Sequence, residues 1–128
     1  MPFVLQQNPT YRWPLTLVIP TDGGKKEKYS FDALFRRIPQ TRVNEIIKIA
    51  RLSQESVRRR DDEDETQEWQ DQEIARELMA GWFDVIDEKG EEVPFTTSTF
   101  NMLLELPTAA SQIVREWFKS VEVAKRKN

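Results

Sequence analysis

Two residue types that carry much of protein chemistry are missing from this chain of 128 residues, which has no cysteine and no histidine. The absence of cysteine excludes a disulfide framework, a thiolate metal site and a cysteine nucleophile. The absence of histidine removes the commonest general base and the commonest transition-metal ligand. We therefore expect no catalytic residue, no metal site and no cofactor, and we expect a protein that is not an enzyme.

Long apolar runs and an excess of positive charge are also missing. No run in the chain approaches the roughly 18 apolar residues that span a bilayer, and residues 1–9 lack the basic start and apolar segment of a secretory signal. The formal net charge is −3. This argues against general nucleic-acid binding, because such binders need a surplus of lysine and arginine. The sequence thus predicts a protein of the cytoplasm with no membrane partner.

The length of the chain is that of a single domain. Hydrophobic residues make up 38% of the chain and charged residues 32%, so we expect a well-solvated surface around a core of modest size. The expected domain covers residues 1–128. It comprises an N-terminal β-hairpin (10–36), a helical part (40–124) and a basic tail (125–128).

Two alternating runs predict an antiparallel β-hairpin over about residues 10–36. Period-two alternation of apolar side chains is the signature of a half-buried strand. The apolar positions are Tyr11, Trp13, Leu15, Leu17 and Ile19 in the first run, and Tyr29, Phe31, Ala33 and Phe35 in the second. A lone hairpin is only marginally stable in water. Its apolar face must therefore lie on the helices or be covered by another subunit.

Helical spacing of apolar residues follows the hairpin and predicts about four helices, at about 40–60, 66–83, 97–106 and 107–123. The densest stripes are Ile74, Ala75, Leu78, Met79 and Trp82, and later Ala110, Ile113, Val114, Trp117, Phe118 and Val121. We expect Thr97 or Ser98 to cap the third helix. The predicted fold class is α+β, mostly α, with the hairpin followed by a bundle of about four helices.

Charge runs and paired acids support two further hypotheses. Three arginines at 58–60 meet five acids at 61–65, which is typical of a solvated loop, and the glycine of a calcium-binding loop is absent. A small regulatory or adaptor protein could contact DNA through residues 58–60 or the basic tail at 125–127. An enzyme could use the carboxylates of Asp84 and Asp87, but no nucleophile, base or phosphate-binding loop accompanies them.

The order of several motifs along the chain resembles the tail assembly chaperones of long-tailed bacteriophages. The matching stretches are residues 8–11 with a strand ending at Pro20, 31–37, 80–82 with Asp84 and Asp87, 94–96 with the helix leading to 106–110, and 127–128. Together they extend over most of the chain, and their order and spacing carry the resemblance. The charged run at 58–65 departs from the family pattern, so the resemblance implies no role for it.

The resemblance implies a protein that binds other proteins and makes no covalent chemistry. Its implied partners are the tape measure protein and tail tube subunits, its implied place is the cytoplasm of the bacterial host, and it is absent from the mature virion. A chaperone needs exposed apolar surface, so we expect partner binding at the hairpin face and at one helical tryptophan. These candidates are Trp13, Leu15, Leu17, Phe31, Phe35 and Trp69. The same side chains also suit a core, and we expect self-association because strand edges and spare aromatics need cover.

Overall fold

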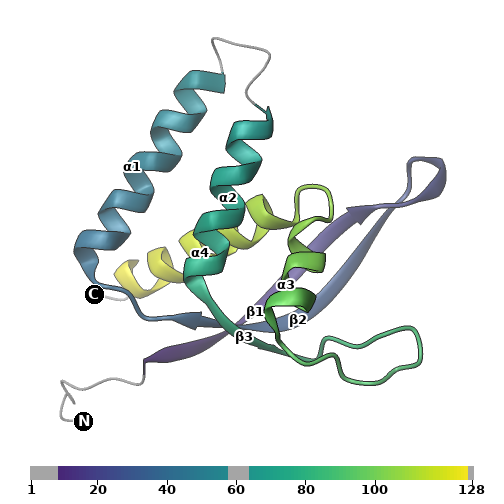
Figure 1. Cartoon of the computed structure of the whole chain (residues 1–128). Coiled ribbons are helices and arrows are strands. Elements are labelled where there is room, and N and C mark those ends of the chain that lie inside the picture. The colour runs from purple at the N-terminus through teal and green to yellow at the C-terminus, as the bar shows by residue number, and fades with distance from the viewer. Residues whose placement is uncertain (1–8, 58–63, 127–128) are drawn as a thin grey trace.

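The computed structural model describes residues 9–57 and 64–126, with side chains described over 9–50 and 70–122. Within these residues the chain forms one three-stranded sheet, and the helices lie on one side of it (Figure 1). The elements in order are β1 (Thr10–Pro20), the short 3-10 helix η1 (Asp22–Gly24), β2 (Lys26–Arg36), α1 (Gln40–Val57), α2 (Asp64–Leu78), β3 (Met79–Phe83), α3 (Thr97–Leu104) and α4 (Ala109–Arg126).

The hairpin formed by β1 and β2 agrees with the predicted range of 10–36. The strands pair antiparallel along their whole length, from Thr10 opposite Arg36 to Pro20 opposite Lys26. The turn between them uses Gly23 and Gly24 at φ angles of 74° and 77°, which glycine adopts without steric cost. Buried residues alternate with less buried ones in the middle of β1 and the second half of β2, and they pack in one core with residues of the helices. The chain's own helices therefore cover the apolar face of the hairpin except near its turn, where Tyr29 is 50% exposed.

A third strand corrects the predicted fold. β3 pairs antiparallel with β2, which becomes the central strand of the sheet. Its register places Phe83 opposite Asp32 and Gly81 opposite Leu34, with an irregularity after Leu34. The prediction of a helix over 66–83 is wrong, because α2 ends at Leu78 and the chain passes directly into the strand. The prediction of a helical bundle preceded only by a hairpin is wrong for the same reason.

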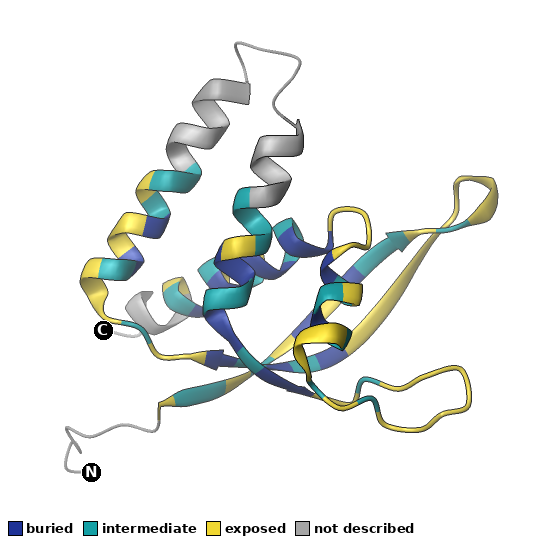
Figure 2. Ribbon diagram, viewed as in Figure 1, coloured by how far each residue is buried: buried dark blue, intermediate teal, exposed yellow. Residues whose placement is uncertain are grey.

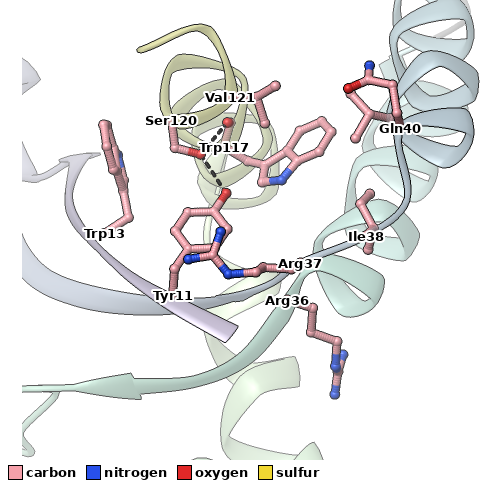
Figure 3. A pocket seen from close by; sticks show the side chains of 10 residues that line it. Tyr11, Trp13, Arg36, Arg37, Ile38, Gln40, Trp117, Ser120 and Val121 are labelled. Atoms are coloured by element: carbon pink, nitrogen blue, oxygen red, sulfur yellow. Dashed lines mark hydrogen bonds between the residues drawn. The ribbon is translucent and has the colours of Figure 1, made fainter. Parts of the chain in front are cut away.

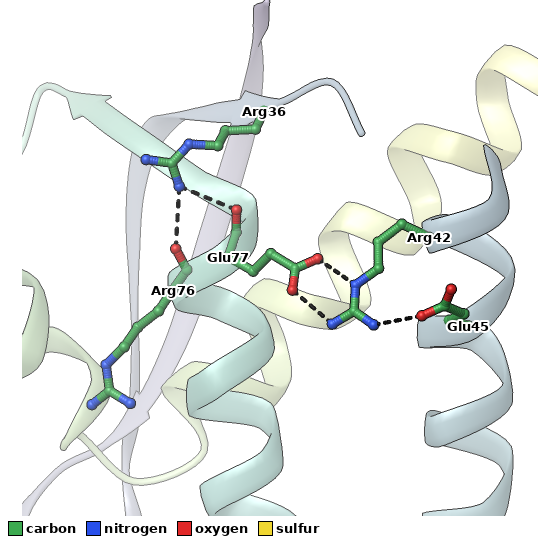
Figure 4. Close-up of polar contacts among 5 residues, drawn as sticks. All are labelled: Arg36, Arg42, Glu45, Arg76 and Glu77. Atoms are coloured by element: carbon green, nitrogen blue, oxygen red, sulfur yellow. Dashed lines mark hydrogen bonds and ion pairs between the residues drawn. The ribbon is translucent and has the colours of Figure 1, made fainter. Parts of the chain in front are cut away.

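The end of α2 has a side-chain cap that the sequence did not reveal. Nη1 of Arg36 donates to three carbonyl oxygens where α2 meets β3, those of Arg76 at 3.3 Å, Glu77 at 3.1 Å and Met79 at 3.1 Å. Figure 4 shows the first two of these bonds. Helix ends leave carbonyl groups without partners, and a cation is favourable there. Arg36 supplies both a hydrogen-bond donor for these carbonyl groups and a positive charge at the end of the helix. α2 can therefore end at Leu78 without a further turn.

The other helices lie close to their predicted ranges. α1 begins at Gln40 as expected and is described as far as Val57, against a predicted end near 60. α3 ends at Leu104 and not at 106, and α4 spans Ala109–Arg126 in place of 107–123. None of the helices in the described part of the chain has the length and hydropathy needed to cross a bilayer.

The core lies between the inner face of the sheet and the helices (Figure 2). Its largest fully buried side chains come from strands and helices alike. They are Trp117, Phe35, Leu15, Ile46, Leu78, Met79, Leu104 and Ile113. Burying one such side chain contributes roughly 1.5–3 kcal/mol. α2 and α4 also contact one another, so the two longest apolar stripes meet each other as well as the sheet.

Candidate functional site

A groove of about 600 Å³ opens where three distant parts of the chain meet (Figure 3). They are the start of β1, the segment that joins β2 to α1, and the last turns of α4. The lining residues are Tyr11, Trp13, Arg36, Arg37, Ile38, Gln40, Val43, Trp117, Ser120 and Val121. Sites of this volume that combine apolar walls with a few polar groups are typical of binding pockets.

One wall of the groove is fixed by a short chain of hydrogen bonds between β1 and α4 (Figure 3). The hydroxyl of Ser120 donates to the carbonyl oxygen of Trp117 at 2.6 Å. A serine hydroxyl has one hydrogen to give, so Tyr11 must be the donor in its 2.7 Å contact with Ser120. Burial raises the pKa of the Tyr11 hydroxyl above its ordinary value, although the Ser120 bond and the charge of Arg37 lower it. Tyr11 therefore keeps its proton and holds the wall in place.

The charge of the groove comes mainly from Arg37. Its guanidinium lies over the ring of Tyr11, 5.1 Å from the ring centre, in a cation–π contact. Its backbone amide donates to the carbonyl oxygen of Pro9 at 2.8 Å, which anchors the residue beside the start of β1. Among the residues with described side chains, no ion pair includes Arg37. Arg36 points away to cap α2 (Figure 3), so Arg37 is the cation that faces the groove.

The structure separates the six predicted partner-binding residues into three groups. Trp13 is half-buried, lines the groove and donates its indole N–H to Oε2 of Glu116 at 3.4 Å. Four others point into the core, where they are 0–7% exposed: Leu15, Leu17, Phe31 and Phe35. The side chain of Trp69 lies outside the described residues. The partner-binding role of the six stays a prediction.

A comparison with known families identifies the chain. A family model described as phage tail assembly chaperone matches residues 1–128. The chain belongs to this family. The resemblance found in its motifs is thereby confirmed, and neither a curated protein nor a solved structure matches this chaperone.

The paired acids of the chaperone have structural roles in the turn after β3. Oδ1 of Asp87 accepts from the backbone amides of Lys89 at 2.9 Å and Glu91 at 3.0 Å. Asp84 lies 3.8 Å from a guanidinium nitrogen of Arg12. Within the described part of the chain, no three acidic, histidine or cysteine side chains gather as a metal ion would need. The runs at 58–60 and 61–65 and the basic tail lie outside the described side chains.

Of the residues that line the groove of the chaperone, only Trp13 was among the predicted site residues, and the aromatic and cationic ones that were not are Tyr11, Arg37 and Trp117. Tyr11 and Trp117 were assigned to apolar stripes, and Arg37 was noted only as part of a matching motif. The doublet of Arg36 and Arg37 at the end of an alternating strand was the available signal. The doublet alone could not predict that Arg36 caps α2 while Arg37 faces the groove. That difference depends on where α2 ends.

Proposed function

We propose that this chaperone binds the tape measure protein and tail tube subunits during tail assembly, and that the groove is its principal contact. The observation that carries the proposal is the meeting, in one hollow, of aromatic walls with Arg37, a cation that forms no ion pair with any of the described side chains. Aromatic and arginine side chains dominate binding energy at protein interfaces. A partner segment that suits this groove presents a large apolar side chain beside a carboxylate.

The mode of action follows from the same features. Binding through an apolar and cationic groove is reversible and needs no reactive side chain, so we propose that the protein is not an enzyme. Its proposed place is the cytoplasm of the bacterial host, from which it does not enter the mature virion. Self-association stays a prediction, and the helices that cover the hairpin face remove one of the grounds for it. The DNA-binding alternative depends on residues 58–60 and 125–127 and also stays a prediction.

A pair of charge reversals tests the groove. Tagged tape measure protein and tagged tail tube protein are each co-expressed with the wild-type chain, with Arg37→Glu or with Arg115→Glu. Both arginines are exposed and both changes alter the net charge equally, but Arg115 lies on α4 outside the groove lining. We expect Arg37→Glu to lower the affinity for at least one partner by about tenfold, equivalent to about 1.4 kcal/mol. We expect Arg115→Glu to bind like the wild type.

Two outcomes would contradict the proposal. If the wild-type chain captured neither tail protein, the partners would be wrong. If Arg37→Glu and Arg115→Glu weakened capture equally, or not at all, the groove would not be the contact. Melting temperatures of both variants provide the control, because the loss of the contact with Tyr11 should cost only about 0.5–1 kcal/mol of stability.

A further inference from the structure

The outer edge of β1 is blocked at three positions, which are Pro14, Val18 and Pro20. The side-chain amide of Gln112 on α4 pairs with Val18, accepting from its N–H at 2.8 Å and donating to its carbonyl oxygen at 2.9 Å. The backbone groups of Val18 therefore point away from β2, and those of alternate residues along β1 do the same. Pro14 and Pro20 occupy two of these positions, where proline offers no N–H to an added strand.

β2 pairs with β1 along one side, but its other side is left uncovered by β3 over about half of its length. We call this uncovered part, residues 26–30, the open edge of β2. Lys28 pairs with Val18, so its backbone groups also point away from the hairpin, as do those of Lys26 and Ser30. β3 covers β2 only from Asp32 to Phe35. The chain leaves the sheet after Phe83, at Asp84, whose φ angle is 67°. Within the described residues, the outward backbone groups at 26–30 have no strand partner.

Successive side chains along this open edge point to opposite faces of the sheet, and the two faces differ in charge and polarity. Lys26 and Lys28 lie on the outer face, opposite the uncharged residues Pro20 and Val18. Among the residues with described side chains, neither lysine takes part in an ion pair. On the inner face Tyr29 is 50% exposed, because the helices do not extend over this end of the hairpin (Figure 1). On the same face the carboxylate of Glu27 accepts from the Tyr29 hydroxyl, so a strand added here would meet positive charge on one face and an aromatic ring beside a carboxylate on the other.

We propose that the open edge of β2 binds an extended segment of a partner protein as a fourth strand, in which acidic residues alternate with apolar ones. Strand addition of this kind obtains affinity from backbone hydrogen bonds and specificity from alternate side chains. A second copy of this chain is a poor occupant, because pairing β2 with β2 would set lysines near lysines, and like charges across strands are unfavourable. The proposal adds a second contact to the proposed function and rests on it for the identity of the partner as a tail protein.

Matched proline variants test the edge. Ser30 and Thr16 are cross-strand partners whose hydroxyls lie 3.0 Å apart. Ser30→Pro and Thr16→Pro both break this contact and both remove one outward N–H, but from opposite edges of the hairpin. The probe is an acetylated peptide of about eight residues, somewhat longer than an average strand, in which glutamate alternates with valine. A second peptide has lysine in place of glutamate. Binding is measured by NMR on the isotope-labelled full chain.

We expect the acidic peptide to slow amide exchange at Lys28 and Ser30, and the lysine peptide to bind at least about tenfold more weakly. Ser30→Pro should weaken acidic-peptide binding by about tenfold and Thr16→Pro by less than about twofold. Equal effects of the two prolines, equal binding of the two peptides, or no protection at these amides would overturn the inference. Because no tail protein enters this assay, its failure is distinct from failure of the capture experiment.

A charge exchange provides a readout that does not depend on proline. The double variant Lys26→Glu/Lys28→Glu keeps every backbone donor of the edge and reverses its charge. It should prefer the lysine peptide over the acidic one. A double variant that still preferred the acidic peptide would overturn the inference, whatever the stability of the proline variants.

Discussion

At the scale of single residues, the ion pair between Arg42 and Glu77 joins α1 to α2 (Figure 4). The guanidinium makes two bonds to the carboxylate, each of 2.7 Å. These bonds are the main reason why the pKa of Glu77 lies below its ordinary value of 4.5 and why the pKa of Arg42 is raised. A carboxylate with a lowered pKa adds stability above its unfolded pKa, and that stability is lost as the pH falls through the folded value.

We expect Glu77→Gln to lower the free energy of unfolding at neutral pH by at most about 1 kcal/mol, since the pair is partly exposed and water screens it. The difference from the wild type should disappear in acid, once Glu77 is protonated. Urea unfolding at neutral and acidic pH measures both effects. Glu45→Gln is the control, because Glu45 makes a single bond to Arg42 and its side chain is 62% exposed. A Glu77→Gln deficit that persisted unchanged in acid would contradict this reading.

At the scale of elements, the sequence was sufficient to predict those helices and strands whose position follows from the local pattern of apolar residues. The alternation of apolar residues was enough to place both strands of the hairpin, because one face of each contributes buried side chains to the core, Leu15 and Leu17 from β1 and Phe31, Ala33 and Phe35 from β2. It was not enough to find β3. Met79 and Trp82 fit the helical stripe that starts at Ile74, and both are buried in the strand as well. The choice between helix and strand depends on β2, whose paired residues lie 44 to 51 positions earlier in the chain and whose edge is stabilised by a further strand.

The start of α3 shows the same limit on a smaller scale. Thr97 or Ser98 was expected to cap this helix, whereas the cap is Thr96. Thr96 and Thr99 bond reciprocally, each side chain accepting from the other's backbone amide, at 3.1 and 2.9 Å. Residues 96–99 all have hydroxyl side chains, so local chemistry permits several caps. The burial of Phe100 sets the rotation of the helix, and that burial depends on tertiary packing.

Substitution at Gly81 tests whether residues 79–83 form a strand. A β-carbon there would lie 3.5 Å from Cδ2 of Leu34, which is an ordinary contact. In a helix, alanine would be more stable than valine by about 0.6 kcal/mol. In a strand, β-branched residues are favoured, so we expect Gly81→Val to be at least as stable as Gly81→Ala. Urea unfolding of the two variants decides, and a clear advantage for alanine would contradict the assignment of β3.

At the scale of the whole molecule, the groove could not have been predicted from the sequence. Trp13 was selected beforehand, but the groove also needs Tyr11, Arg37 and Trp117, which come from three separate segments. The hydrogen bond that closes one wall joins residues 109 positions apart. Composition and motif order predicted a protein-binding chain of the right family, because these signals do not depend on contacts. The location of a binding surface does depend on them.

The central claim is that the groove receives a tail protein. Amide hydrogen exchange on the wild-type chain, with and without the tape measure protein, measures this without any substitution. We expect exchange to slow in the three segments that form the groove, residues 11–13, 36–43 and 117–121, and to change less on the exposed turn at 87–91. A stable complex whose protection avoided all three segments would contradict the claim.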